Sequence, residues 1–115
     1  MKIRDNLDAL MAHHPEIYEA YSRYGQAVHT LGGPLDEPTR WLIKVATSAA
    51  LGLEKAQITH MAKALEAGCT LEELEHTILL VAPTAGFPRM MEAMERFRAL
   101  QAEAASASGG APSGL

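Results

Sequence analysis

Cysteine is almost absent from this sequence, and its scarcity excludes two kinds of chemistry. The 115 residues contain one cysteine, Cys69. A single cysteine can form neither an intrachain disulfide nor a Cys-x-x-Cys redox pair. Because Cys69 falls between two predicted helices, we interpret it as a structural residue.

Aromatic and β-branched residues are also scarce. Hydrophobic residues make up 48% of the sequence but aromatic residues only 5%, and alanine, leucine and methionine supply the difference. Strands favour β-branched and aromatic residues, whereas alanine, leucine and methionine are strong helix formers. The composition therefore predicts an all-α protein.

Long apolar runs, basic clusters and metal-binding spacings are missing as well. The net charge is −4, which gives no support to a nucleic-acid partner. The first ten residues lack the apolar core of a signal peptide, and no run approaches membrane-spanning length. We found no His, Cys and carboxylate cluster with metal-ligand spacing. We therefore expect a cytoplasmic protein with no membrane partner, no metal and no cofactor.

The apolar periodicity and the helix-breaking residues predict about six helices in one compact domain over residues 1–104. Asp5, Asp36 and Thr70 are the expected N-caps, and Thr70 with Glu73 fits a capping box. The predicted helices cover residues 6–13, 15–31, 37–51 and 54–67, a segment from 71 to the breakers that begin at Pro83, and residues 88–104. Residues 105–115, rich in Ala, Ser, Gly and Pro, read as a disordered tail.

The fourth predicted helix has two apolar faces, which is unusual for a short helix. At helical spacing, one face carries the larger side chains, and we expect it to face the core. The other is a stripe of alanines around His60. A helix buried on both sides packs against a second helix, a pocket or a neighbouring subunit. We therefore expect oligomerisation to complete the core. The two faces are Ile58, Met61, Ala62 and Leu65, and Ala56, His60, Ala64 and Ala67.

Short motifs along the chain, in a consistent order, resemble the carboxymuconolactone decarboxylase family, which includes the alkylhydroperoxidase D-like proteins. Each motif alone is weak, and their order and spacing carry the resemblance. It covers roughly residues 15–97. The motifs are Leu35 to Arg40 followed by an apolar run, Leu51-Gly52-Leu53-Glu54, His60, Ala64-Leu65, Ala67-Gly68, Thr70, Glu72-Glu73-Leu74 and Gly86-Phe87-Pro88.

The resemblance implies an all-helical domain that forms trimers or hexamers, with small-molecule sites near subunit contacts. Its peroxidase branch carries a Cys-x-x-Cys pair before the histidine, and a proton-relay glutamate further upstream. Those positions fall here on Leu53, Ala56 and Trp41. None of the three can replace its counterpart, because peroxide reduction by this mechanism needs two thiols.

The decarboxylase branch lacks the cysteine pair and keeps the histidine, as this sequence does. The resemblance is closer to that branch, although Thr84 stands where a tyrosine is expected and Pro83 is unusual there. This implies a lyase acting on a small carboxylated lactone or related organic acid. His60 would be the catalytic acid, and the substrate-binding residues would be Arg40, Trp41, Leu53 and Ala56.

Two other functions remain open. The chain could be a non-catalytic oligomeric protein that binds small organic acids, since the replaced residues make the pocket more apolar. An alkylhydroperoxidase-type oxidoreductase is disfavoured by the missing cysteine pair.

Overall fold

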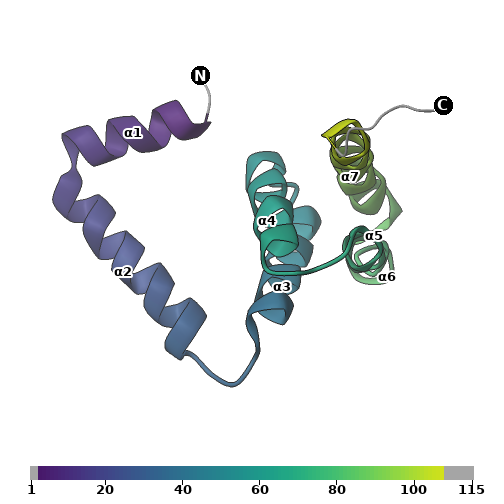
Figure 1. The fold of residues 1–115 in the computed structure, drawn as a ribbon, viewed down its shortest axis with the longest axis horizontal. Coiled ribbons are helices and arrows are strands. Elements are labelled where there is room, and N and C mark those ends of the chain that lie inside the picture. Colours follow the sequence, from purple (N-terminus) through teal and green to yellow (C-terminus); the bar gives the residue numbers. More distant parts are fainter. Residues whose placement is uncertain (1–2, 108–115) are drawn as a thin grey trace. The chain divides into compact units, whose positions relative to one another are not determined.

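The computed structural model describes residues 3–107 and confirms the all-α prediction (Figure 1). Within that range the chain forms seven helices and no strand. No helix in the described range is long and apolar enough to cross a membrane. The helices are α1 (Ile3–His13), α2 (Pro15–Leu31), α3 (Glu37–Leu51), α4 (Glu54–Glu66), α5 (Leu71–Leu79), α6 (Ala82–Ala85) and α7 (Phe87–Ala107).

The contacts divide the chain into two units, residues 1–35 and residues from 36 onward. In the first unit, α2 follows α1 after His14, and Pro15 occupies its first turn. The expected cap at Asp5 is wrong, because α1 already begins at Ile3 and Asp5 lies within its first turn. Five large apolar side chains of α2 are more than half exposed: Ile17, Tyr21, Tyr24, Val28 and Leu31.

The second unit begins with a well-capped helix. The Thr39 backbone N–H donates to Asp36 Oδ1 at 3.1 Å. Hydrogen bonds from Thr39, and to a smaller extent the charge of Arg40, lower the pKa of the Asp36 carboxyl. The predicted capping box also forms, since Thr70 Oγ1 accepts from the Glu73 N–H and Glu73 Oε1 accepts from the Thr70 N–H. Both caps follow from local sequence alone.

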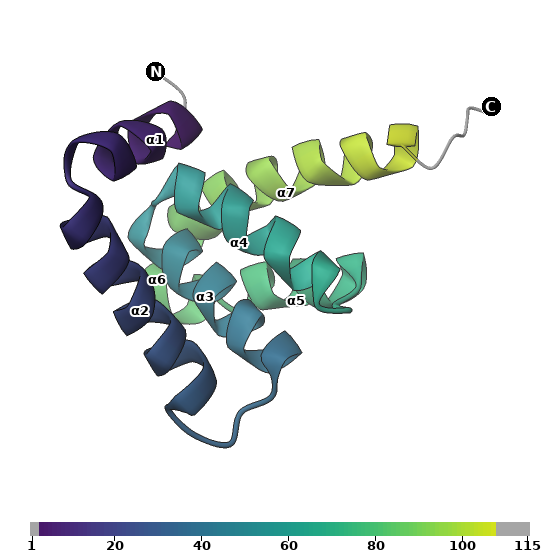
Figure 2. The same ribbon diagram turned by 60° about the vertical axis from the view of Figure 1, so that its left-hand side comes forward.

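The core of the second unit lies between α3, α4, α5 and α7 (Figure 2). Phe97, Leu74 and Ile78 are among its largest fully buried side chains. One face of the last helix packs into this core, where two of its methionines, an alanine and a phenylalanine are buried together. These residues are Met90, Ala93, Met94 and Phe97.

Two boundaries differ from the prediction. The last helix continues to Ala107, three residues into the segment expected to be a tail, because its alanines are good helix formers. Residues 108–115 lie outside the described range. The breakers after α5 do not end helical structure altogether, since Pro83 lies in the first turn of the short α6. A single domain over residues 1–104 remains a prediction.

Candidate functional site

A tight turn between α3 and α4 places the two helices side by side. Gly52 ends α3 in the left-handed conformation, with φ of 72°. Its N–H donates to the Ala49 carbonyl at 3.2 Å, and the Leu53 N–H donates to the Ser48 carbonyl at 2.9 Å. This closes the end of α3 and starts α4 at once. The chain therefore folds back, and the middle of α4 lies against the middle of α3.

His60 contacts α3 through one ring nitrogen. It is half-buried, and its Nδ1 lies 3.2 Å from the backbone carbonyl oxygen of Lys44. A carbonyl oxygen only accepts hydrogen bonds, so Nδ1 must carry the hydrogen of this contact. In neutral His60, the lone pair is then on Nε2. The backbone of α3 thus selects which nitrogen of His60 exchanges protons.

The Lys44 carbonyl is also held from within α3. Ser48 Oγ lies 2.9 Å from the Lys44 oxygen and 3.0 Å from the Val45 oxygen, and it can donate its one hydrogen to either. Ser48 is buried. The acceptor that orients His60 is therefore fixed in a regular helix, next to a buried hydroxyl.

Trp41 joins the same cluster from α3. Its ring centroid lies 5.9 Å from that of His60, with the ring planes inclined by 44°. Its Nε1 donates to Glu37 Oε2 at 3.3 Å, which orients the indole. The Lys44 ammonium lies 4.7 Å from the centroid of the indole, within cation–π distance. Trp41 thus contacts both the imidazole and a cation.

The other predicted binding residues lie on α3, on α4 or at the start of α4. Ala56 is half-buried one turn before His60 on the same helix, and Leu53 is the N-cap residue of α4, 49% exposed. Arg40 is half-buried one turn before Lys44 on α3. Of the predicted site residues, Trp41 and His60 are in ring contact. The structure also adds Lys44, whose ammonium lies over the Trp41 ring.

The expected core face of α4 is partly wrong. Ile58 is 47% exposed and Ala62 is exposed, whereas Gln57, Met61 and Ala64 are fully buried. Relative to the predicted core face, the buried face of α4 is turned about the helix axis by about one residue. Ala64, assigned to the stripe around His60, therefore belongs to the core.

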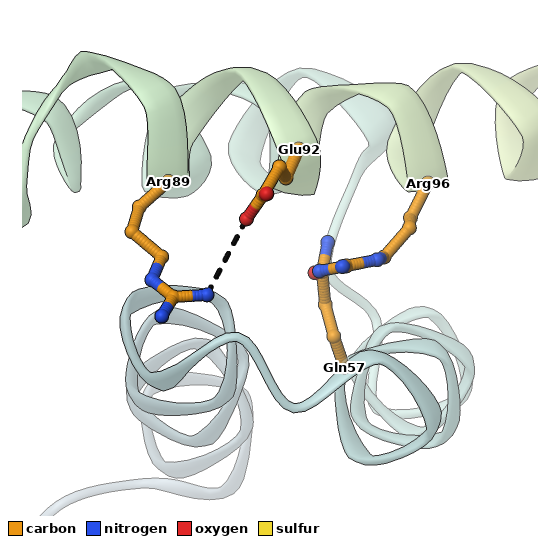
Figure 3. Close-up of polar contacts among 4 residues, drawn as sticks. All are labelled: Gln57, Arg89, Glu92 and Arg96. Carbon is orange, nitrogen blue, oxygen red and sulfur yellow. Dashed lines mark hydrogen bonds and ion pairs between the residues drawn. The ribbon is translucent and has the colours of Figure 1, made fainter.

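Gln57 explains this rotation, because both ends of its amide bond to α7. Nε2 donates to the Ala93 carbonyl at 2.9 Å, and Oε1 accepts from Arg96 Nη1 at 2.9 Å. Figure 3 shows Arg96 reaching from α7 toward the Gln57 amide. A buried polar group is stable when its hydrogen bonds are made, so Gln57 can replace an apolar core residue here. No pattern in the residue types indicated that Gln57 has partners on α7.

A second arginine of α7 covers the turn between α3 and α4. Arg89 Nη1 lies 3.3 Å from Glu92 Oε1, and both side chains point from α7 toward the turn (Figure 3). A Cβ on Gly52 would overlap the Arg89 guanidinium. A cation is favourable at a helix C-terminus, where carbonyl groups concentrate negative charge.

Cys69 lies apart from this cluster, at the turn before α5. It is buried, and its Sγ donates to the Pro38 carbonyl at 3.5 Å. Burial, together with the nearby charges of Glu73 and Asp36, raises the pKa of the Cys69 thiol. A protonated, buried thiol is a poor nucleophile, which agrees with a structural role.

Two further features of the described residues bear on the chemistry. No group of three or more His, Cys, Asp or Glu side chains within residues 3–107 could hold a metal ion.

An open groove of about 630 Å³ lies along α7, but it contains no histidine and none of the predicted site residues. It is lined by Leu79, Met90, Met91, Glu92, Met94, Glu95 and Arg98.

Comparisons with known proteins agree with this architecture. Residues 15–99 match the family model described as the carboxymuconolactone decarboxylase family. An uncharacterized protein of Methanocaldococcus jannaschii is 34% identical over 91 residues, which cover 79% of this chain and 84% of that protein.

Two solved structures share the fold. One is the apo form of a carboxymuconolactone decarboxylase family protein from Legionella pneumophila, with a TM-score of 0.78 and 27% identity. The alignment covers 86% of this chain and 88% of that one. The other, from Burkholderia xenovorans LB400, is provisionally assigned as a carboxymuconolactone decarboxylase. It has a TM-score of 0.71 and 24% identity, with coverage of 91% and 84%, and it supports the fold alone.

Proposed function

The chain belongs to the carboxymuconolactone decarboxylase family, and on this premise we propose that it acts on a small carboxylated lactone or related organic acid. His60 would supply the proton. The observation that carries this proposal is the contact between His60 Nδ1 and the Lys44 carbonyl. It assigns proton exchange to Nε2, and a histidine with a defined tautomer is suited to acid–base catalysis.

The proposed reaction ends with the transfer of one proton to one carbon atom of the substrate. The bond between the carboxylate carbon and its neighbour breaks, carbon dioxide leaves, and the electron pair passes into an extended enolate. Protonated His60 donates its Nε2 proton to that enolate and is reprotonated by water. Arg40 is the predicted partner of the substrate carboxylate, and Trp41, Leu53 and Ala56 are predicted to line the site.

The alternative is a protein that binds such acids without converting them. The apolar residues at positions 41, 53 and 56 favour it, because they supply contact area but no second acid or base. A peroxidase function is disfavoured, since the buried thiol of Cys69 has a raised pKa and no second cysteine exists.

We further propose a cytoplasmic homo-oligomer, a trimer or a hexamer. The exposed large apolar side chains of α2 support association, because soluble monomers rarely expose many such residues on one helix. Leu80 and Phe87 near α6 are also more than 60% exposed.

The test is a panel of carboxylated lactones and aromatic acids, with products identified by mass spectrometry. We expect His60→Gln to reduce turnover by about a hundredfold or more, since general acid catalysis contributes that much. His76→Gln, on the exposed surface of α5, is the matched control and should retain full turnover. Light scattering should give the same assembly for all three proteins. Unchanged turnover in His60→Gln would contradict the assignment. Binding without turnover by the wild type would support the non-catalytic alternative.

A further inference from the structure

We infer that Lys44 binds the carboxylate of the ligand at the His60 site and so makes the site selective for organic anions. This inference rests on the proposed function and assigns the anion-binding role to a residue other than the predicted Arg40.

The first argument is position. The backbone carbonyl of Lys44 accepts the hydrogen bond from His60, and its ammonium lies over the ring of Trp41, which in turn contacts His60. Lys44 therefore orients the His60 imidazole through its backbone carbonyl and places its positive charge over the neighbouring Trp41 ring. A ligand that reaches His60 alongside Trp41 comes within range of this ammonium.

The second argument is charge. Among the described residues, no carboxylate lies within 4 Å of the Lys44 ammonium. The two lysines of α4 differ from Lys44, since Lys63 pairs with Glu66 at 3.8 Å and Lys55 is exposed. Lys44 is half-buried, and an anion at such a place is less screened by solvent than at the open surface. Its contact with the Trp41 ring leaves the ammonium hydrogens able to donate to an anion.

The third argument concerns Arg40. Its charge acts on Asp36, where it is one of the causes that lower the pKa of that carboxyl. Part of the attraction between Arg40 and a ligand would therefore be offset by a carboxylate already nearby. Among the described residues, Lys44 has no carboxylate within salt-bridge distance, and its own backbone carbonyl is the group that contacts His60.

Trp41 provides the measurement, because it is the only tryptophan in the chain. Its fluorescence is titrated with a γ-butyrolactone carboxylate and with the neutral methyl ester of the same acid. We expect the wild type to bind the acid more tightly than the ester. Lys44→Gln should weaken binding of the acid about tenfold and leave the ester unchanged, because one charge-assisted hydrogen bond is lost.

Three further variants make the test specific. Lys44→Met keeps the aliphatic stem over Trp41 without the charge, and it should behave as Lys44→Gln does. Lys44→Arg should retain the preference for the acid. Lys55→Gln, which removes a charge from the exposed surface of α4, should match the wild type. Thermal melting of each variant confirms that it is folded at the assay temperature.

The outcomes separate this inference from the proposed function. If the wild type prefers the acid and both uncharged Lys44 variants keep that preference, Lys44 is not the anion-binding residue, and the proposed function stands. In that case Arg40→Gln identifies the alternative. If the wild type binds neither compound of this pair nor any acid of the panel, the proposed function fails and this inference fails with it.

Discussion

Gln57 and His60 lie one turn apart on α4, yet their surroundings differ in kind. Gln57 is fully buried, and both ends of its amide bond to α7. His60 is half-buried, and its ring is oriented by a backbone carbonyl of α3. The amide cannot titrate, whereas the imidazole can gain or lose a proton on Nε2. The same helix therefore contains one polar residue that fixes its packing and another, His60, that we propose as the acid of the candidate site.

The largest expected effect on stability is at Gln57. Gln57→Ala should lower the free energy of unfolding by about 2–4 kcal/mol, because it removes the hydrogen bonds to the Ala93 carbonyl and the Arg96 guanidinium and opens a cavity. Urea denaturation gives the value. His60→Gln is the matched comparison, and its effect on stability should be below about 1 kcal/mol. Equal losses of unfolding free energy in Gln57→Ala and His60→Gln would contradict the view that Gln57, and not His60, fixes the packing of α4.

Gly52, in the turn that precedes both residues, should give a smaller effect. Gly52→Ala places a side chain at φ of 72°, and we expect a loss of about 1–2 kcal/mol from this backbone conformation. The overlap with Arg89 should add little, because the end of a long side chain can move. A double-mutant cycle with Arg89→Ala tests this point. A much smaller cost of Gly52→Ala in the Arg89→Ala background would show that the overlap dominates.

The smallest effect is at Cys69, and it depends on pH. Burial raises the pKa of this thiol above its ordinary value of 9.0, so the folded chain keeps the proton where the unfolded chain has lost it. Stability from this group is complete below about pH 9 and is lost as the pH rises through the folded pKa. Between pH 8 and pH 10, wild type should lose more stability than Cys69→Ala in urea unfolding. Identical pH dependence in both proteins would contradict the shift.

The sequence predicted the features whose causes are local. The caps at Asp36 and Thr70 and the stop at Gly52 each depend on a few neighbouring residues, and all three are confirmed. The cap at Asp5 failed because α1 begins earlier, and an acidic residue is also favourable inside a first turn.

The packing of α4 could not be predicted in the same way. Its rotation depends on Gln57 finding partners on α7 at positions 93 and 96, and a polar residue gives no periodic signal of burial. At the candidate site, the resemblance implied Trp41 and His60 as site residues. The group that orients His60 is a backbone carbonyl oxygen. Every residue has such a carbonyl, so the residue types could not indicate which one contacts His60.

The hydrogen bonds of His60 and Gln57 also close loops of different length. The contact from His60 to Lys44 spans 16 residues, whereas those of Gln57 span 36 and 39 residues. Closing a loop costs conformational entropy that grows with its length, by about 0.6 kcal/mol for each doubling. By this measure the histidine contact is the easier of the two to form in an unfolded chain. We therefore expect the contact between α3 and α4 at the candidate site to cost less loop-closure entropy than the contacts of Gln57 with α7, which fix the rotation of α4.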